Sequence, residues 1–340
     1  MSEQAVIEIK ALNKTYPRGF IHRYEALKNV DLSVKKAEIF GFLGPNGAGK
    51  TTLIKSILGL LKHDSGSIRL FGKDINDPEV KSNIGYLPET PNFYSYLTAF
   101  EIMKLYARLY NMKDPFTLPS PAREEGGLKK GIASQTHPSD GYTVRNDRSL
   151  DDIIKEKLEL VGLKDAIHTR LRAFSKGMLQ RLGMAQALIN EPALLILDEP
   201  MSGLDPIGRA EFKEIMRELK KQSKTIFFSS HIIPDAEELC DRVAIIRSGR
   251  IIKIGSVSEL MDTGTTGVDI TAKGKLNDQV KQLVKDITCS NEQCIFHVHE
   301  PERTNMILSE LIKNGFSIIK VEPVRQSLET LISKMIKEKA

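Results

Sequence analysis

The sequence predicts an α/β fold in which a parallel-type sheet is flanked by helices. Three short apolar runs, Ile39–Leu43, Leu194–Leu197 and Thr225–Ser230, have the length expected of buried strands. Helical patterns alternate with such runs through about residue 250, and this alternation is typical of parallel sheets covered by helices. Polar residues stand at the end of each run, at the carboxyl edge where sheets of this kind bind ligands.

Several predicted helices carry recognisable start signals. Thr98 and Glu101 form a capping-box pattern ahead of a helix over about residues 100–110. Asp205 followed by Pro206 has the pattern of an N-cap and a first helical residue. Another helix is expected over residues 52–61, because its apolar residues recur on one helical face.

The chain of 340 residues is long enough for about two domains. We expect a first domain over residues 1–255, with a helical subdomain at about 90–190, and a small α+β domain over residues 266–340. Residues 113–149 lack periodicity and are rich in Pro, Gly, Ser and charge, which predicts a disordered insertion. In the last part, strands are expected at 294–298 and 317–321, and helices at 305–313 and 328–337.

Composition favours a cytosolic protein that does not itself span a membrane. The net charge of +5 is mild, and such an excess is most often only a solvated surface. No apolar stretch reaches the roughly 18 residues needed to cross a bilayer, and the N-terminus lacks the order of a signal peptide. The three cysteines, Cys240, Cys289 and Cys294, show no zinc spacing and suit a reducing compartment. Cys289 and Cys294 can pair or bind metal, but we expect buried or idle thiols.

One loop fits the phosphate-binding pattern G-x-x-x-x-G-K-[ST]: Gly44-Pro45-Asn46-Gly47-Ala48-Gly49-Lys50-Thr51. Its glycines let the backbone wrap around phosphate, with free N–H groups pointing inward, and the helix that follows adds the positive end of its dipole. Lys50 is expected to bind the β- and γ-phosphates and the Thr51 hydroxyl to bind Mg²⁺, with Thr52 also at the nucleotide. A chance glycine turn is the weaker alternative, because the loop lies between a predicted buried strand and an amphipathic helix.

Asp198 and Glu199 follow the apolar run Leu194–Leu197, at the same predicted sheet edge as the phosphate loop. Adjacent side chains of an extended chain point to opposite sides, so the two carboxylates can take different tasks. We expect Asp198 to hold Mg²⁺ and Glu199 to orient or deprotonate the attacking water. An Asp-Glu pair on its own is usually a solvated surface, and the neighbouring motif is what favours catalysis here.

A third motif is Phe174-Ser175-Lys176-Gly177-Met178, followed by Gln180-Arg181. With it, the sequence resembles the ATP-binding subunits of ABC transporters over about residues 5–255, and the motifs occur in that family's order. The family's signature motif is usually Leu-Ser-Gly-Gly-Gln, so Lys176 and Met178 depart from it, whereas Ser175 and Gly177 keep it. Ser175 can cap a helix whose N-terminus binds phosphate, and the resemblance implies that this phosphate belongs to ATP on a second subunit.

The resemblance implies further roles near the nucleotide. Ser202-Gly203-Leu204-Asp205 matches the loop that crosses the dimer interface. His231, after the run Thr225–Ser230, matches the switch histidine that contacts the γ-phosphate. Tyr16 matches the aromatic residue that stacks on adenine, with Tyr24 as a competitor.

Glu89 occupies the place where the family normally has glutamine. A carboxylate can still ligate Mg²⁺, although it adds a negative charge beside phosphate, so we count Glu89 with Thr51 and Asp198 as metal ligands. The resemblance also implies a phosphate-loop ATPase core with N-terminal antiparallel strands.

The function implied by the resemblance is ATP hydrolysis coupled to transport. ATP and Mg²⁺ are the expected cofactors, and the expected partners are a second ATP-binding subunit, in a homodimer, and a membrane-spanning transporter subunit. The chain is then cytoplasmic and peripheral on the cytoplasmic face of the membrane, with no nucleic acid as partner. The segment Gln326-Ser327-Leu328-Glu329 resembles the tail of exporter-type subunits and points to export.

Two alternatives are weaker. ABC ATPases that act on DNA or ribosomes usually carry a long coiled coil or two ATP-binding halves, and this chain has one set of motifs without sustained heptads. Non-hydrolysing regulatory subunits typically lose the catalytic carboxylate, whereas Asp198 and Glu199 are both present.

Overall fold

The computed structural model describes residues 5–18, 22–112, 149–261, 265–284, 286–290, 293–325 and 328. The predicted insertion at 113–149 and the predicted helix at 328–337 lie outside these residues, apart from Ser149 and Leu328. The backbone divides into two units, one of Met1–Ile39 with Gly49–Ser229 and one of Phe40–Ala48 with Ser230–Ala340. The predicted boundary between residues 255 and 266 stays a prediction.

The first unit begins with an antiparallel sheet. Its strands are β1 (Ala5–Arg18), β2 (His22–Lys35), β4 (Ser65–Leu70) and β5 (Lys73–Asp74), in the order β2-β1-β4-β5. Alternate apolar residues are buried on one face of each long strand, as period-2 patterning requires: Ile7 and Ile9 in β1, and Val30, Leu32 and Val34 in β2. The expected antiparallel N-terminal strands are thereby confirmed.

Parallel strands form the centre of the same unit. β6 (Ile84–Leu87), β7 (Leu194–Leu197) and β8 (Thr225–Ser230) pair in parallel, so their carboxyl ends meet at one edge. β7 and β8 are buried along their whole length and have the predicted bounds. α6 (Pro206–Lys221) begins as predicted, with the Asp205 carboxylate accepting the Gly208 N–H at 2.8 Å.

α1 (Lys50–Ile57) is shorter than the helix predicted over residues 52–61. Its end is set by Gly59, whose φ of 69° is a left-handed conformation that commonly terminates helices. The apolar periodicity continues beyond Ile57 and past this glycine. The prediction from periodicity alone therefore placed the C-terminal end of the helix too late.

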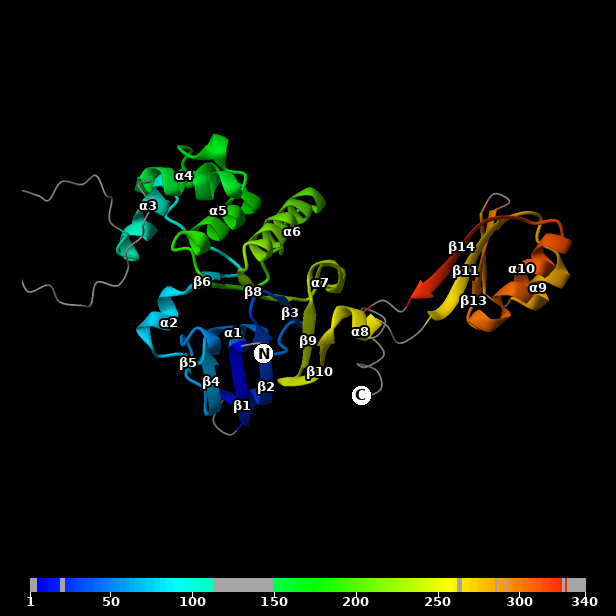
Figure 1. Cartoon of the computed structure of the whole chain (residues 1–340), viewed down its shortest axis with the longest axis horizontal. Coiled ribbons are helices and arrows are strands. Elements are labelled where there is room, and N and C mark those ends of the chain that lie inside the picture. The colour runs from blue at the N-terminus through cyan, green and yellow to red at the C-terminus, as the bar shows by residue number, and fades with distance from the viewer. Residues whose placement is uncertain are drawn as a thin grey trace, which may run out of the picture. The chain divides into compact units, whose positions relative to one another are not determined.

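The predicted helical region contains α3 (Ala99–Leu109), α4 (Leu150–Leu160) and α5 (Lys176–Leu188), which pack together (Figure 1). The single turns η1 (Lys164–Ala166) and η2 (Leu171–Ala173) also lie in this region, whereas the short α2 (Pro78–Ser82) precedes it. The capping box of Thr98 and Glu101 forms as predicted, with both reciprocal hydrogen bonds present. None of the helices in the described ranges is long and apolar enough to span a membrane.

In the second unit, β3 (Ile39–Leu43) pairs in parallel with β9 (Arg242–Arg247), and β9 pairs antiparallel with β10 (Arg250–Ser256). Within this unit the strands lie in the order β10-β9-β3. Two short helices, α7 (Ile233–Leu239) and α8 (Val257–Met261), precede β9 and follow β10.

The last part of the chain has its own antiparallel sheet and core. β11 (Thr265–Lys273), β12 (Ile287–Ser290), β13 (Gln293–Val298) and β14 (Ser317–Arg325) are ordered β12-β13-β11-β14. α9 (Asp278–Leu283) and α10 (Thr304–Lys313), with the turn η3 (Pro301–Arg303) between, pack apolar residues against one face. The predicted α+β character of this part is confirmed.

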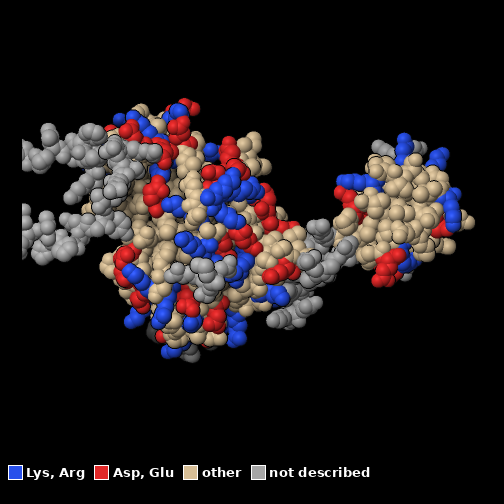
Figure 2. Space-filling model, in the orientation of Figure 1, with Lys and Arg blue, Asp and Glu red and all other residues tan. Residues whose placement is uncertain are grey.

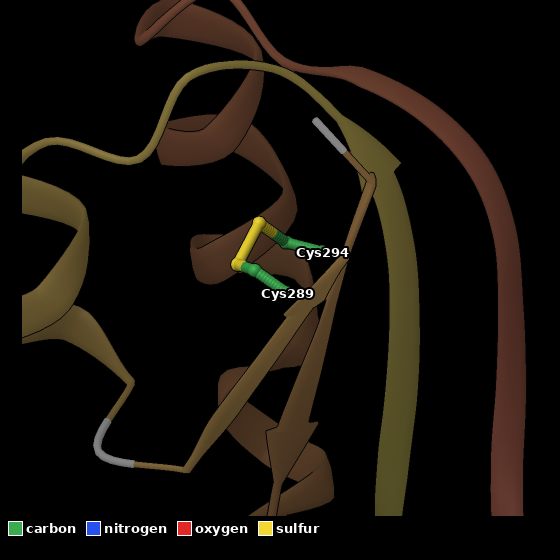
Figure 3. The surroundings of a disulfide bond; sticks show 2 residues. All are labelled: Cys289 and Cys294. Carbon is green, nitrogen blue, oxygen red and sulfur yellow. A yellow bond between two sulfur atoms is a disulfide. The ribbon is translucent and has the colours of Figure 1, made fainter. Parts of the chain in front are cut away.

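Cys289 and Cys294 form a disulfide between β12 and β13 (Figure 3). The expectation of idle thiols was wrong for this pair, whereas Cys240 takes no part in a disulfide. The two cysteines are direct cross-strand partners, and residues directly opposite on antiparallel strands have Cβ atoms close enough to be bridged. The two cysteines are five residues apart in the sequence, so their pairing could not be predicted without the register of the β12–β13 hairpin.

Charged side chains of both signs are interspersed over the visible face of the described residues (Figure 2), as the mild net charge of +5 suggests. One ionic cluster connects the helices with the sheet. Glu191, in the loop before β7, accepts hydrogen bonds from Lys157 of α4 and from Lys224, next to β8. Burial acts to raise the pKa of Glu191, but the hydrogen bond and charge of Lys157, with the charge of Lys224, outweigh it and lower the pKa.

Glu191→Gln should lower the free energy of unfolding at pH 7 by about 1 kcal/mol, because the amide leaves the Lys157 ammonium, 7% exposed, without this counter-charge. Because the pKa of Glu191 is lower in the folded protein, its carboxylate stabilises the fold at pH values above the unfolded pKa of about 4.3. This stabilisation is lost as the pH falls through the folded pKa. Urea unfolding from pH 7 to pH 3 should therefore show the two proteins converging on acidification.

The matched control is Glu214→Gln, which removes an exposed pair with Arg217 on α6. This change should cost less than about 0.5 kcal/mol. Equal losses in the two variants, or a difference from wild type that is constant with pH, would contradict the assigned role of Glu191.

Candidate active site

The phosphate loop joins β3 to α1 and has the backbone that the motif requires. Gly47 and Gly49 have φ values of 78° and 112°, which L side chains rarely adopt. A Cβ on Gly44 would collide with the carbonyl oxygen of Ile246 and lie 2.9 Å from its Cγ2. α1 has no acidic residue in its first turn, so nothing there opposes an anion at the helix N-terminus.

Lys50, the first residue of α1, forms an ion pair with Glu199. The Lys50 Nζ and Glu199 Oε1 atoms are 3.1 Å apart, and the two side chains are only 6% and 9% exposed. Thr51 is exposed and Thr52 half-buried next to this lysine. The pair brings the predicted phosphate-binding cation together with the predicted catalytic carboxylate.

Ser229 was not singled out from the sequence, yet its hydroxyl holds both predicted carboxylate positions. The Ser229 Oγ donates to Asp198 Oδ1 at 2.7 Å and accepts the Glu199 backbone N–H at 2.9 Å. The available signal was its place near the carboxyl end of the run Thr225–Ser230, next to the run that leads to Asp198.

We expected Asp198 and Glu199 to alternate along an extended chain, and this expectation was wrong. β7 ends at Leu197, and Glu199 has a φ of 47°, a left-handed conformation that is uncommon for residues other than glycine. Such conformations cost free energy and persist where surrounding contacts fix them. The bond from the Glu199 N–H to Ser229 is one such contact, so the direction of the Glu199 side chain is set by a turn rather than by strand alternation.

Tyr86 of β6 is another nearby group that sequence patterns did not indicate. Burial, with a further contribution from the charge of Asp198, raises the pKa of Tyr86 to about 12. The hydroxyl therefore stays protonated near neutral pH and adds no negative charge beside the carboxylate.

Asp198 and Thr51 suit a Mg²⁺ ion that is bound mainly through nucleotide phosphates. Mg²⁺ usually takes one or two carboxylates and completes its shell with phosphate oxygens and water. The described residues contain no group of three or more His, Cys, Asp or Glu that could hold an ion without such help. Glu89 is exposed in the loop after β6, where the neighbouring Leu87 carbonyl accepts the Asp198 N–H at 2.8 Å. Its role as a metal ligand stays a prediction.

The predicted signature residues and the predicted interface loop lie together. Ser175 caps α5 as predicted, its Oγ accepting the Met178 N–H at 3.2 Å. A Cβ on Gly177 would lie 3.5 Å from Leu204, and Gly203 is covered by the side chain of Lys176. Asp205 closes the loop by capping α6, so the start of α5 and residues Ser202–Asp205 form one surface.

His231 follows β8 and is exposed. With Gly44 and Pro45 it lines a cavity of about 150 Å³, whose other lining residues are Leu43, Ile233, Ile245, Ile246, Arg247 and Ile252. The histidine thus lies beside the beginning of the phosphate loop, a place that is compatible with its predicted contact to the γ-phosphate.

Tyr16 and Tyr24 are direct cross-strand partners in β1 and β2. Opposite residues of antiparallel strands project from the same face, so the predicted adenine-stacking residue and its competitor stand side by side. Lys14 Nζ lies 5.6 Å from the Tyr16 ring centroid. Adenine stacking on Tyr16 stays a prediction.

Comparison with known proteins identifies the family of the chain. A sequence model of the family described as "ABC transporter" matches residues 27–202. An uncharacterised ABC transporter ATP-binding protein of Synechocystis sp. is 37% identical over 338 residues, 98% of this chain and 85% of that protein. The fluoroquinolones export ATP-binding protein of Mycobacterium tuberculosis is 36% identical over 259 residues, 75% of this chain and 72% of that protein.

Among solved structures, an ATP-binding subunit of an ABC transporter superposes with a TM-score of 0.57 at 29% identity, covering 75% of this chain and 91% of that one. The family match spans more than half of the chain, and the similarity to the Synechocystis protein extends over nearly all of it. The chain therefore belongs to the ABC transporter family, as an ATP-binding and ATP-hydrolysing subunit.

Proposed function

We propose that two copies of this chain close around two ATP molecules, hydrolyse them and so drive export through a separate membrane-spanning subunit. Each nucleotide is held by the phosphate loop of one copy and by Ser175–Gly177 of the other. The observation that carries the proposal is the cluster of Lys50, Asp198, Glu199 and Ser229, in which a buried cation and two carboxylates meet at one end of the parallel strands.

Lys50 has two successive partners in this scheme. In the structure its ammonium lies 3.1 Å from a Glu199 carboxylate oxygen. Phosphate oxygens carry more negative charge and compete for the same ammonium, so ATP binding frees the Glu199 carboxylate. The freed carboxylate accepts a proton from the attacking water, while Lys50 stabilises charge on the transferred phosphoryl group.

The remaining residues orient the reactants. Asp198, held by Ser229, and the Thr51 hydroxyl would hold Mg²⁺, which neutralises phosphate charge when bound. His231 contacts the γ-phosphate from the end of β8, and Tyr16 stacks on adenine. Ser175–Gly177 complete the site from the second copy, so a single copy hydrolyses slowly.

Export is supported by the name of the Mycobacterium tuberculosis relative, a fluoroquinolones export ATP-binding protein. Work on a transporter also requires a membrane-spanning partner, which places this chain at the cytoplasmic face of the membrane. The closed pair binds ATP more tightly than ADP, and this difference in affinity is what shifts the equilibrium and moves the partner.

Glu199→Gln should bind Mg-ATP, because Lys50, Thr51 and Asp198 remain, but should turn over at least about a hundredfold more slowly without its base. Sizing chromatography with ATP should then show an accumulated dimer. Adding Ser175→Arg should abolish that dimer, because the larger cationic side chain fills the space of the opposing γ-phosphate. A dimer that forms equally well without nucleotide would contradict ATP-driven closure.

A tyrosine surface is the proposed docking site of the membrane subunit. Tyr94 and Tyr96 are 59% and 66% exposed, and their ring centroids are 5.8 Å apart. Phe93, in contrast, is half-buried and packs edge-on against Tyr106 of α3, at 6.4 Å. Exposed aromatic residues are frequent anchors of protein contacts, and Glu89 lies only a few residues before them.

Replacing both Tyr94 and Tyr96 by Ala should weaken membrane association at least about tenfold and leave ATP affinity and thermal stability unchanged. Phe93→Ala should instead lower the melting temperature, since it removes a packed ring. Co-purification with the membrane subunit and ATP titration measure the two effects. Loss of ATP binding or of folding in the tyrosine variant would place the docking site elsewhere.

A further inference from the structure

We propose that Lys176 gives the triphosphate on the opposing subunit a second cationic contact, beyond the helix end capped by Ser175. The inference rests on the proposed function, because it requires two copies of the chain to share each nucleotide. Lys176 is the first residue of α5 and stands where the signature motif usually has glycine, so this contact distinguishes the present chain.

The exposed Lys176 side chain lies against the interface loop. A Cβ atom added to Gly203 would lie 2.8 Å from Lys176 Cε and 3.0 Å from Cδ, and would collide with the ammonium. Gly203 also has a φ of 73°, so a side chain at this position is disfavoured by both space and backbone. The aliphatic part of Lys176 therefore lies across the Gly203 backbone, with its ammonium next to Gly203.

This ammonium occupies an electrostatically unfavourable place. The N-terminus of a helix carries partial positive charge, which repels cations and attracts anions. α5 has no acidic residue in its first turn, and Lys176 forms no ion pair within the described part of the chain. The lysine thus adds a full positive charge where the protein itself provides no counter-charge.

Unused hydrogen-bond donors lie at the same helix end. The N–H groups of Lys176 and Gly177 precede the first intrahelical bond, and neither donates to an acceptor among the residues that the structure describes. One turn along the same face lies Gln180, which is 1% exposed and whose two amide atoms have no hydrogen-bond partner in the described ranges. Side chains of a helix lean toward its N-terminus, so this buried amide leans toward the same end.

An anion at the start of α5 satisfies the Lys176 and Gly177 N–H groups and the Lys176 ammonium together. A phosphate accepts hydrogen bonds from the two N–H groups and pairs with the ammonium, and charge-assisted contacts of this kind are the strong ones. Because ATP carries one more phosphate than ADP at the end that faces the opposing copy, Lys176 should add to the preference of the closed pair for ATP. Lys176 is a binding residue in this scheme and takes no part in proton transfer.

The test uses the full chain with Glu199→Gln, in which the ATP-bound dimer should accumulate. Sedimentation with Mg-ATP should give a dimer dissociation constant about a hundredfold weaker for added Lys176→Gln, about tenfold for each of two sites. The dependence of this constant on NaCl concentration should also flatten, because fewer charges attract. Lys176→Arg should stay within about threefold of the parent, since it keeps the charge.

Lys155→Gln is the matched control, because Lys155 is an exposed lysine of α4 for which no ion pair occurs within the described residues. It should leave both the dimer constant and its salt dependence unchanged. The affinity of the monomer for ATP and the melting temperature should be the same in all four proteins, which separates a role in closure from a role in folding.

Equal dimer constants and equal salt dependence in the parent and in Lys176→Gln would overturn this inference alone. Tighter dimerisation of Lys176→Gln would also overturn it, because the lysine would then oppose closure. If the parent itself forms no ATP-dependent dimer, the proposed function fails and this inference fails with it.

Discussion

One buried hydroxyl fixes the geometry on which the chemistry of this site depends. Ser229 donates to the Asp198 carboxylate at 2.7 Å and accepts the Glu199 N–H at 2.9 Å, so a single atom of β8 holds two consecutive residues beyond β7. Both bonds are formed away from water, where an unmade hydrogen bond is costly. Glu199 keeps its left-handed backbone, with a φ of 47°, and its side chain reaches Lys50 of α1.

The charges of the site follow from this arrangement. Two carboxylates and one ammonium lie almost out of contact with solvent, and Tyr86 remains uncharged beside them, with a pKa of about 12. A buried ion pair contributes little net stability, because desolvation offsets the attraction. Removing one partner is costly, however, because the other charge is then buried without a counter-charge. In our account, phosphate is that replacement for Lys50. The Lys50–Glu199 pair therefore joins the two groups to which our account assigns phosphate binding and proton transfer.

Most of the fold could be predicted from the sequence, because its signals are local. The bounds of β3, β7 and β8 and the caps at Thr98, Ser175 and Asp205 all correspond to patterns within a few residues. What sequence could not show depends on distant contacts or on single backbone angles. Ser229 gains its role only when β8 pairs beside β7, the Cys289–Cys294 bridge needs the hairpin register, and the turn at Glu199 replaces the expected alternation.

The central claim is that the Ser229 hydroxyl positions Asp198 and Glu199 for hydrolysis, and the kinetics of Ser229→Ala test it most directly. Ser56→Ala is the control, because it also removes a buried hydroxyl, which is bonded to the Thr52 carbonyl at 2.9 Å. Loss of a hydrogen bond to a charged group should lower kcat about 10- to 100-fold, while the ATP dissociation constant changes less than about threefold. Lys50 and the phosphate loop do not depend on this hydroxyl for binding. A kcat equal to that of the Ser56→Ala control, or a loss of ATP affinity as large as the loss in kcat, would contradict the account.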